Sequence, residues 1–416
     1  MIRDILLTQK RELEERRNEQ YIERNIALDL SGPLIKVIIG PRRSGKSFFA
    51  IKSLFSAGNF GYANFDDETL ISLKDYNEIV AELKSIYGNP KIILFDEIQN
   101  LPRWELFVNR LQRLGFIIIL TGSNANLLAK ELATHLTGRH IPTYLFPFSF
   151  SEYASVSKKE LTTAEYKSML EEYLLHGGYP EPTTKTLNYK EYLSVLFDSI
   201  IYKDIVRRYK IRLPHYVDSL ASYLISNTAT ENSFHSLAKA TGIKSPNSVR
   251  KYAGYLAEAF LVFTIPRFSF KLREQLSSNQ KVYCYDNGFI FAKSFSSSPN
   301  TGRLYENVIA SELKKAELAG HLNVFYWKNQ QNEEVDFVVR RGLKIEFLIQ
   351  SCFDIRDSKT KEREIRALLK AGKELKCDNL IIINSEKEGS EDFEWFGMKG
   401  TVTFIPLWKW LLHLSW

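Results

Sequence analysis

Short apolar runs, separated by polar and helical stretches, dominate the first part of the chain. The runs VIIG at 37–40, KIILF at 91–95 and FIIIL at 116–120 are rich in β-branched residues, as strands buried on both faces require. The stretch GYANFDDETL at 61–70 reads as a further strand, and SFFAIKSLF at 47–55 as a helix. This alternation of strands and helices predicts an α/β fold built on a parallel sheet.

The pattern changes twice more toward the C-terminus. Helical periodicity fills the stretch after residue 150, and short helices followed by two apolar strands come next. The last part reads as a helix, several strands and a closing amphipathic helix, which is again an α/β pattern. A serine-rich stretch near 295–302 is the clearest boundary. The predicted divisions are 1–150, 151–225, 226–300 and 301–416.

The N-terminal sequence QKRELEERRNEQYIERNI, at 9–26, carries many opposite charges four residues apart. Such pairs stabilise an exposed helix. We therefore predict a mixed-charge helix here, solvated or at an interface, in preference to an arm that binds nucleic acid.

Composition and charge change this picture only slightly. Among 416 residues, 56 basic side chains face 49 acidic ones, for a net charge of +7. This balance is compatible with a polyanionic partner but is weak evidence for one. The start of the chain lacks the apolar core of a secretory signal, and no apolar run approaches the ~18 residues of a membrane span. Three isolated cysteines favour a reducing cytoplasm, with neither a disulfide framework nor a thiolate zinc site.

The loop after the first strand matches the pattern GxxxxGK[ST] at every position and lies between a strand and a helix. Its glycines let backbone N–H groups cradle phosphate oxygens at a helix N-terminus. Lys46 is expected to reach the β- and γ-phosphates of ATP, and the Ser47 hydroxyl to bind Mg²⁺. The predicted nucleotide-binding residues of this loop are Gly40, Pro41, Arg42, Arg43, Ser44, Gly45, Lys46 and Ser47.

Two further strand ends carry polar groups suited to the same site. Asp96 and Glu97 follow a run of apolar residues, and the carboxyl end of a parallel strand faces the ligand crevice. Asp96 is expected to hold Mg²⁺ and Glu97 to polarise the attacking water, which indicates hydrolysis beyond binding. Ser123 and Asn124 end the next strand, after Thr121, and are predicted to sense the γ-phosphate.

The stretches LFDEIQNLPRWELFVNRL and TGSNANLLAKELATHLTGRHIPTYLFPFSFSEY, followed by YLLHGGYPEP, extend these motifs. Together they resemble the archaeal and bacterial AAA-type ATPases, of AAA_14 type, that carry a C-terminal DUF4143 domain like PD-(D/E)XK nucleases. The resemblance implies a P-loop core, a helical lid and a C-terminal nuclease-like domain. It also implies a role for Arg139, which either reaches phosphate in the same or a neighbouring subunit or is structural. Arg207 and Arg208 form a second pair, read either as trans-acting or as a solvated helix face.

The segment from 234 onward has the layout of a winged helix-turn-helix. One short helix ends at Gly242, and the next begins at Ser245 and Pro246, which are favoured capping and first-turn residues. In DNA-binding proteins the second helix of such a module enters the major groove, and the wing contacts the backbone. The same module also contacts proteins. The predicted DNA contacts are Asn247, Arg250, Lys251, Lys271 and Arg273.

The C-terminal part resembles the PD-(D/E)XK fold, in which two acids and a lysine hold Mg²⁺ and activate water. The matching acids are Glu306, Asp336 and Glu346. Leu348 occupies the position of the lysine, and leucine cannot stabilise the charge that develops during phosphodiester cleavage. We therefore predict a degenerate nuclease fold, with Lys344 or Lys328 as substitutes that the sequence leaves open.

The leading hypothesis is a cytoplasmic, Mg²⁺-dependent ATPase that acts on DNA, in repair, junction processing or mobile-element maintenance. The sequence leaves open whether the chain forms a homo-oligomer. A nucleotide-controlled switch that binds protein partners is the second hypothesis, and an ATP-licensed nuclease is the third. No membrane association is expected. Salt dependence of DNA binding separates the first two, because phosphate contacts release counterions.

Overall fold

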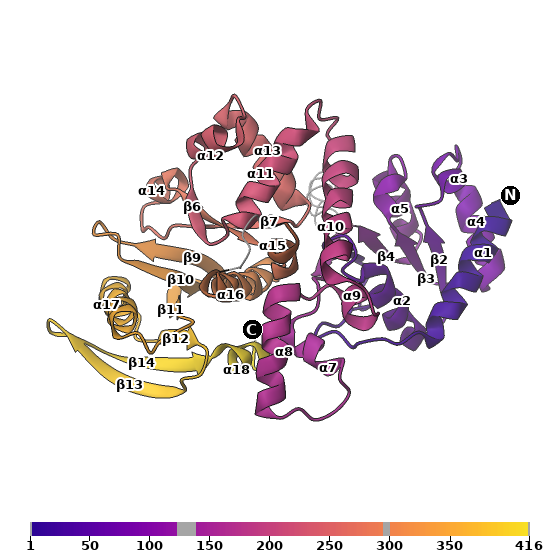
Figure 1. Cartoon of the computed structure of the whole chain (residues 1–416). Helices are drawn as coiled ribbons and strands as arrows, with labels where there is room; N and C mark the ends of the chain where they lie inside the picture. Colours follow the sequence, from indigo (N-terminus) through magenta and orange to yellow (C-terminus); the bar gives the residue numbers. More distant parts are fainter. Residues whose placement is uncertain (1, 123–138, 294–299, 415–416) are drawn as a thin grey trace. The chain divides into compact units, whose positions relative to one another are not determined.

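The computed structural model describes residues 2–122, 139–293 and 300–414 (Figure 1). The chain divides into two compact units, which we describe separately. Unit 1 comprises residues 1–147 with 258–260, and unit 2 comprises 148–257 with 261–416. None of the helices within the described ranges is long and apolar enough to cross a lipid bilayer.

Unit 1 is built on a parallel sheet in the strand order β2-β3-β4-β1-β5. The predicted α/β fold with a parallel sheet is therefore confirmed. All the predicted strands are present, and their apolar side chains are almost entirely buried, because helices lie against the sheet. The strands are β1 (Ile35–Ile39), β2 (Phe60–Asn64), β3 (Ile92–Asp96), β4 (Ile117–Gly122) and β5 (His140–Tyr144). The helices are α2 (Lys46–Ala57), α3 (Glu68–Ile71), α4 (Asn77–Tyr87) and α5 (Trp104–Arg113), with a 3-10 turn at Ile98–Asn100.

The N-terminal helix is shorter than predicted. Helix α1 spans Ile2–Glu15, a 3-10 turn follows at Arg16–Asn18, and the chain from Glu19 is extended. Helix α1 buries Leu6 and Leu13 and packs against α4 and β2. After this helix, Lys52 Nζ donates hydrogen bonds to the carbonyl oxygens of Arg17 at 2.8 Å and Glu19 at 2.9 Å. These tertiary contacts use carbonyl groups that a longer helix would need for its own hydrogen bonds. The expected helix over 9–26 is therefore wrong in its second half.

Unit 2 begins with helices in the stretch predicted as a lid. Side-chain caps start several of them, as in the reciprocal bonds of Ser149 with Glu152 and of Thr162 with Glu165. Helix α10 continues directly into a π-helix, a rare conformation. The elements are α7 (Phe150–Ser155), α8 (Thr163–His176), α9 (Pro180–Thr184), α10 (Tyr189–Ser199), the π-helix Ile200–Arg207 and α11 (Pro214–Ser226).

A small antiparallel sheet, in the order β6-β8-β7, follows α11. Two helices separate its first two strands, and Pro246 begins the second of these helices, as predicted. The tip between β7 and β8 holds a short helix that the sequence pattern did not reveal. The elements are β6 (Thr230–Asn232), α12 (Phe234–Thr241), α13 (Pro246–Glu258), β7 (Val262–Pro266), α14 (Leu272–Ser277), β8 (Gln280–Cys284) and α15 (Asn287–Lys293).

The C-terminal part is a mixed sheet in the order β13-β14-β12-β11-β10-β9. Helix α17 packs on this sheet over a core that includes Val338, Leu348 and Phe404. The elements are α16 (Thr301–Leu318), β9 (Asn323–Lys328), β10 (Glu334–Arg341), β11 (Lys344–Ser351), α17 (Ser358–Leu375), β12 (Leu380–Asn384), β13 (Gly389–Trp395), β14 (Met398–Pro406) and α18 (Leu407–Leu412).

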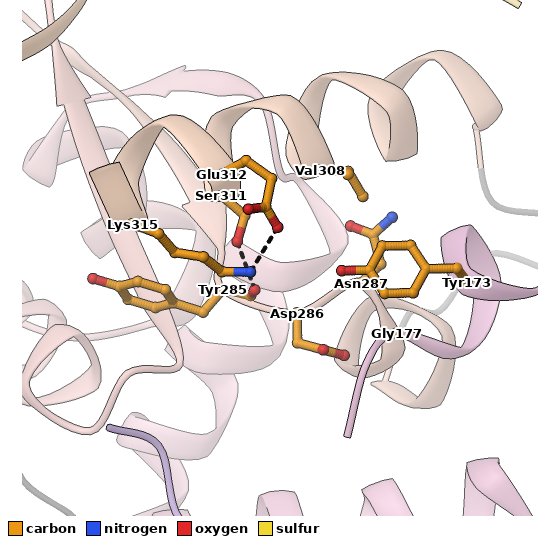
Figure 2. Close-up of a pocket in the computed structure, with 9 residues that line it drawn as sticks. All are labelled: Tyr173, Gly177, Tyr285, Asp286, Asn287, Val308, Ser311, Glu312 and Lys315. Atoms are coloured by element: carbon orange, nitrogen blue, oxygen red, sulfur yellow. Dashed lines mark hydrogen bonds and ion pairs between the residues drawn. The ribbon is translucent and has the colours of Figure 1, made fainter. Parts of the chain in front are cut away.

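Buried polar contacts join the three segments that were predicted as separate parts of unit 2. The Asp286 carboxylate, just after β8, accepts bonds from the backbone N–H groups of Gly178 at 2.9 Å and Gly288 at 2.8 Å. Asn307 of α16 bonds the backbone of Cys284. Figure 2 shows the small cavity beside Asp286, about 10 Å³ in volume and lined from α8, α15 and α16. The lid, the small sheet and the C-terminal part thus form one unit, although their boundaries stay a prediction.

Candidate functional site

The predicted phosphate loop connects β1 to α2 at the carboxyl edge of the parallel sheet. Gly45 precedes α2 with φ 93°, a left-handed conformation that favours glycine. A Cβ on Gly40 would lie 1.9 Å from the carbonyl oxygen of Leu145, so only glycine fits there. The loop leads into the N-terminus of α2, where the first N–H groups have no partner within the helix. This end of α2 is therefore suited to bind an anion.

Polar groups inside the loop are arranged for a phosphate ligand. Lys46 is only 4 % exposed, and its Nζ donates to the Pro41 carbonyl at 2.8 Å. The Ser44 hydroxyl is buried and has no hydrogen-bond partner among the described residues. A buried polar group without a partner is costly. These donors fit the terminal phosphates of ATP. Arg42 is half-buried and Arg43 is exposed.

Asp96, at the end of β3, is buried, and its carboxylate accepts hydrogen bonds from three hydroxyl groups. Ser47 Oγ donates to Oδ1 at 2.8 Å, Thr121 Oγ1 donates to the same oxygen, and the Tyr62 hydroxyl donates to Oδ2 at 3.1 Å. Burial raises the pKa of Asp96, as does the charge of Glu97, and the hydroxyl groups oppose that rise. Hydroxyl and carboxylate oxygens are the ligands that Mg²⁺ prefers. Ser47 and Asp96, already in contact, fit a Mg²⁺ site.

Glu97 is held in a left-handed conformation, with φ 49°, that an ordinary residue adopts only at a cost of about 1 to 2 kcal/mol. Its N–H donates to Thr121 Oγ1 at 3.1 Å, and Gln99 Nε2 donates to its Oε2. The strained turn and these bonds fix the carboxylate beside Asp96. Thr121 thus supports both acids, whereas the predicted sensors Ser123 and Asn124 lie outside the described residues.

Arg139 lies at the opposite edge of the sheet. Its carbonyl accepts the N–H of Ile35, the first residue of β1, at 2.9 Å, whereas the phosphate loop follows the last residue of β1. A strand of this length spans roughly 16 Å at about 3.3 Å per residue, which is farther than an arginine side chain extends. The structure therefore does not support a phosphate contact by Arg139 in its own subunit. Because the side chain is exposed, a role toward a neighbouring subunit stays a prediction.

Three residues at this site were missed from the sequence. Arg24 donates to the carbonyl of Ser44 at 3.1 Å and of Phe146 at 2.5 Å, which ties the phosphate loop to the chain after β5. Tyr62 and Gln99 contact the two acids directly. No pattern marked Arg24, because it lies in a mixed-charge stretch. Gln99 belongs to the DEIQ motif, but the motif alone does not indicate that its side chain contacts Glu97.

Comparisons with known proteins agree with this geometry. Residues 33–154 match a family model described as an AAA domain, of AAA_14 type, and residues 167–298 and 301–410 match domains of unknown function, DUF8612 and DUF4143. The uncharacterized protein MJ1544 of Methanocaldococcus jannaschii is 37 % identical over 96 % of this chain and 93 % of its own length. The chain belongs to this AAA ATPase family with a DUF4143 domain. The resemblance inferred from the motifs is confirmed.

One further relative and two solved structures show more distant likenesses. An uncharacterized protein of Haemophilus influenzae is 28 % identical to this AAA ATPase over 81 % of the chain and 86 % of its own length. Among solved structures, the Walker-type ATPase PABY2304 of Pyrococcus abyssi gives a TM-score of 0.42 at 18 % identity, covering 68 % of this chain and 94 % of that one. AMPPCP-bound DnaA from Aquifex aeolicus gives 0.28 at 15 % identity, covering 61 % and 88 %. Both TM-scores are too low to carry an argument.

The residues predicted to contact DNA all lie at the surface of unit 2. Asn247, Arg250 and Lys251 are exposed on α13, and the Arg250 guanidinium lies 5.0 Å from the Phe234 ring. Lys271 and Arg273 are exposed on the tip between β7 and β8. Lys271 forms an exposed ion pair with Glu274 at 3.1 Å, which lowers the charge that it offers to a partner.

The DUF4143 domain corrects the predicted set of nuclease-like acids. Asp336 lies beside Gln350, whose Oε1 accepts the Asp336 N–H at 3.1 Å. A β-bulge leaves Glu346 without a partner in β10, and its carboxylate pairs with Arg341 at 3.1 Å. Gln350 lies four positions beyond Glu346 along the strand, about 13 Å at the usual rise. Glu346 therefore does not join Asp336, because the bulge and the strand register place it elsewhere.

A lysine from β8 occupies the place between the remaining acids. Lys281 is 2 % exposed, and its Nζ lies 2.9 Å from Glu306, 3.1 Å from Asp336 and 2.5 Å from Glu334. Burial lowers the pKa of Lys281, but the carboxylates outweigh it and hold that pKa well above its ordinary value. Burial, and then the charge of Asp336, raise the pKa of Glu306 to about 7.

Neither of the two lysines proposed as substitutes pairs with Asp336 or Glu306 among the described residues. Lys328 pairs with Glu231 at 2.7 Å and reaches the edge of the cluster at Glu334, 3.7 Å away, whereas Lys344 is exposed at the start of β11. The cation beside Asp336 and Glu306 is Lys281, which sequence reasoning missed because it comes from a different part of the chain.

Proposed function

We propose that this chain hydrolyses ATP with Mg²⁺ and couples hydrolysis to binding or remodelling of DNA. One observation carries the ATPase part: the Ser47 hydroxyl lies 2.8 Å from Asp96, at the end of the phosphate loop and next to Glu97. Lys46, Ser47, Asp96 and Glu97 come from two strand ends that the parallel sheet brings together. The AAA domain match supports the same assignment.

Each residue then has a distinct role in the proposed reaction. Lys46 binds the β- and γ-phosphates, Ser47 and Asp96 hold Mg²⁺, and Glu97 orients the attacking water and takes its proton. When bound, Mg²⁺ neutralises charge that develops on the phosphates. The hydrogen bonds from Thr121 and Gln99 keep the acids in place between turnovers.

The DNA part of the proposal is supported by the order of elements from α11 to β8. A helix, a strand, two helices and two strands, with the antiparallel order β6-β8-β7, are typical of a winged helix-turn-helix. Helix α13 takes the position of the recognition helix in such modules. Its exposed Arg250 and Lys251, which form no ion pair with a described residue, offer charge to a phosphate backbone.

The test is the ATPase rate measured alone and with single-stranded, duplex and branched DNA. We expect at least one DNA form to change the rate, since coupling requires that DNA alter the motor. A rate that is the same with every form, together with no salt-dependent DNA binding, would leave the ATPase but remove DNA as its substrate.

A second candidate function is a nucleotide-controlled switch that binds a protein. Phe270, Leu272 and Leu276, on the tip between β7 and β8, are 74 %, 67 % and 75 % exposed. Exposed apolar side chains of this size favour a protein partner over phosphate. Substituting all three with serine would weaken such a partner's binding and leave DNA binding near that of the wild type.

For the DUF4143 domain we propose a structural role without cleavage. The buried Lys281 fills the position beside Asp336 and Glu306. Incubation of supercoiled and branched DNA with Mg²⁺ or Mn²⁺ tests this proposal. We expect the wild type to give no more cleavage products than the Asp336→Asn variant. Cleavage by the wild type that is absent in Asp336→Asn would refute the structural role.

A further inference from the structure

Five cations cluster in the π-helix that continues α10 and in the loop after it. They are Lys203, Arg207, Arg208, Lys210 and Arg212, which we call the basic strip. Four of the five side chains are exposed, whereas the acid within the segment, Asp204, is buried. The π-helix turns its apolar residues Ile200, Ile201 and Ile205 inward, which leaves the cations on the outer face.

The strip is not neutralised by the part of the chain that the structure describes. None of its five side chains forms an ion pair with a described residue, although Lys271, Lys281 and Lys293 in the same unit all do. One guanidinium nitrogen of Arg208 is buried and has no hydrogen-bond partner among the described residues. Like charges this close repel one another, so the arrangement is suited to a partner that brings several negative charges.

The strip is continuous with the exposed face of α13. Tyr209 stacks on Tyr255 of α13, with ring centroids 3.6 Å apart and planes inclined by 7°. Lys251 Nζ lies 5.9 Å from the same Tyr255 ring. The stack therefore places Lys210 and Lys251 on neighbouring parts of one surface. A π-helix is rare and is frequently found at functional sites.

We propose that the basic strip binds the sugar–phosphate backbone of the duplex that α13 contacts. This inference rests on the proposed DNA function and extends it, because it adds a second set of phosphate contacts from outside the helix-turn-helix. Duplex DNA carries one charge per about 1.7 Å of its axis, so a row of cations can engage several phosphates at once. The contacts carry no base specificity; they fix orientation on the duplex and add salt-dependent affinity.

An alternative role for Arg207 and Arg208 is a contact with ATP bound to a neighbouring subunit. The two roles differ in what they predict without DNA. Phosphate-backbone contacts leave the basal ATPase rate unchanged, whereas a trans-acting arginine is needed for that rate.

The experiment compares three full-length variants with the wild type by titrating a labelled duplex at several salt concentrations. The strip variant is Lys203→Gln, Arg207→Gln and Lys210→Gln. The matched control neutralises three exposed lysines of the same unit, Lys359→Gln, Lys373→Gln and Lys376→Gln. The third variant, Arg250→Gln and Lys251→Gln, tests the α13 contact. Thermal unfolding confirms that each variant is folded, and the ATPase rate without DNA is measured separately for each.

Each phosphate contact contributes about 0.9 to the slope of log K against log [salt]. We expect the strip variant to lower the slope by about 2.7 and the control to leave it unchanged, with the basal ATPase rate near that of the wild type. A strip variant that binds like the wild type, while the α13 variant loses affinity, would overturn this inference and keep the proposed function. A wild type without salt-dependent binding would overturn both. Loss of the basal ATPase rate in the strip variant would favour the trans-acting role instead.

Discussion

The Lys281 cluster gives the sharpest prediction about unit 2. Lys281→Met keeps most of the aliphatic stem but removes the ammonium, which leaves Glu306, Asp336 and Glu334 buried or half-buried without their cation. Breaking a buried ion pair by removing one partner costs about 3 to 5 kcal/mol. We therefore expect the free energy of unfolding of unit 2 to fall by that amount.

A matched control separates burial from charge. Lys293 pairs with Asp198 at 2.7 Å in the same unit, but the Asp198 side chain is 52 % exposed. Exposed pairs contribute about 0 to 1 kcal/mol, so Lys293→Met should change stability little. The two variants should therefore differ by at least about 2 kcal/mol, which for a unit of this size corresponds to at least about 4 °C in the thermal midpoint. Equal shifts in the two variants would refute the assignment of a buried network around Lys281.

A second substitution at this position, Lys281→Ala, tests whether the ammonium stands where a divalent cation would fit. Lys281→Ala opens space among three carboxylates, which are oxygen ligands suited to Mg²⁺ or Mn²⁺. We expect Mn²⁺ at a hundredfold excess over its Kd to raise the free energy of unfolding of Lys281→Ala by about 2.7 kcal/mol. The wild type should show no such stabilisation, because its ammonium fills the site. Differential scanning calorimetry with and without Mn²⁺ measures it, and equal responses of the two proteins would contradict the idea.

Three further predictions concern single residues. Lys46→Ala should abolish ATP turnover and weaken nucleotide binding in a fluorescent-nucleotide titration, because it removes the buried cation of the loop; unchanged affinity would contradict that role. Arg139→Ala should lose hydrolysis but keep ATP affinity, and mixing it with Lys46→Ala should restore some activity; a mixture that stays inactive would argue against a contact between subunits. Burial raises the pKa of Asp286 to about 6, whereas the same carboxyl in the unfolded chain releases its proton near pH 4. Between these two pH values the folded state keeps a proton that the unfolded state has lost. The free energy of unfolding should therefore fall by about 3 kcal/mol as the pH rises from 4 to 6. Urea unfolding across pH 4 to 6.5 should show this fall in the wild type and a flatter profile in Asp286→Asn, and identical profiles would refute it.

The sequence predicted the nucleotide site well because its signals are local. β-branched runs define the strands of unit 1, and the phosphate loop needs glycine at positions that a side chain would block, as at Gly40. The order of strand ends then predicts that Ser47 and Asp96 meet, which the structure confirms. The part played by Thr121 depends on strand register, which no local pattern reveals.

Errors occurred where tertiary contacts decide the outcome. A β-bulge in β11 removes Glu346 from the row of residues that faces Asp336, and a bulge leaves no clear mark in the alternation of side chains. Lys281 joins acids that lie 25 and 55 residues away along the chain. The helix expected over 9–26 ends early because Lys52 bonds its carbonyls. Charge spacing alone carries none of this information.

The proposed hydrolytic site is tested most sharply by ATP turnover of the wild type and Glu97→Gln, measured with Mg²⁺ alongside ATP affinity. Glu97 is the acid fixed beside Asp96 by Thr121 and Gln99, and the amide keeps its size while losing its capacity to take a proton. We predict Mg²⁺-dependent turnover in the wild type, and in Glu97→Gln a loss of at least about a hundredfold with ATP still bound. Turnover by Glu97→Gln at the wild-type rate would contradict the assignment of the site.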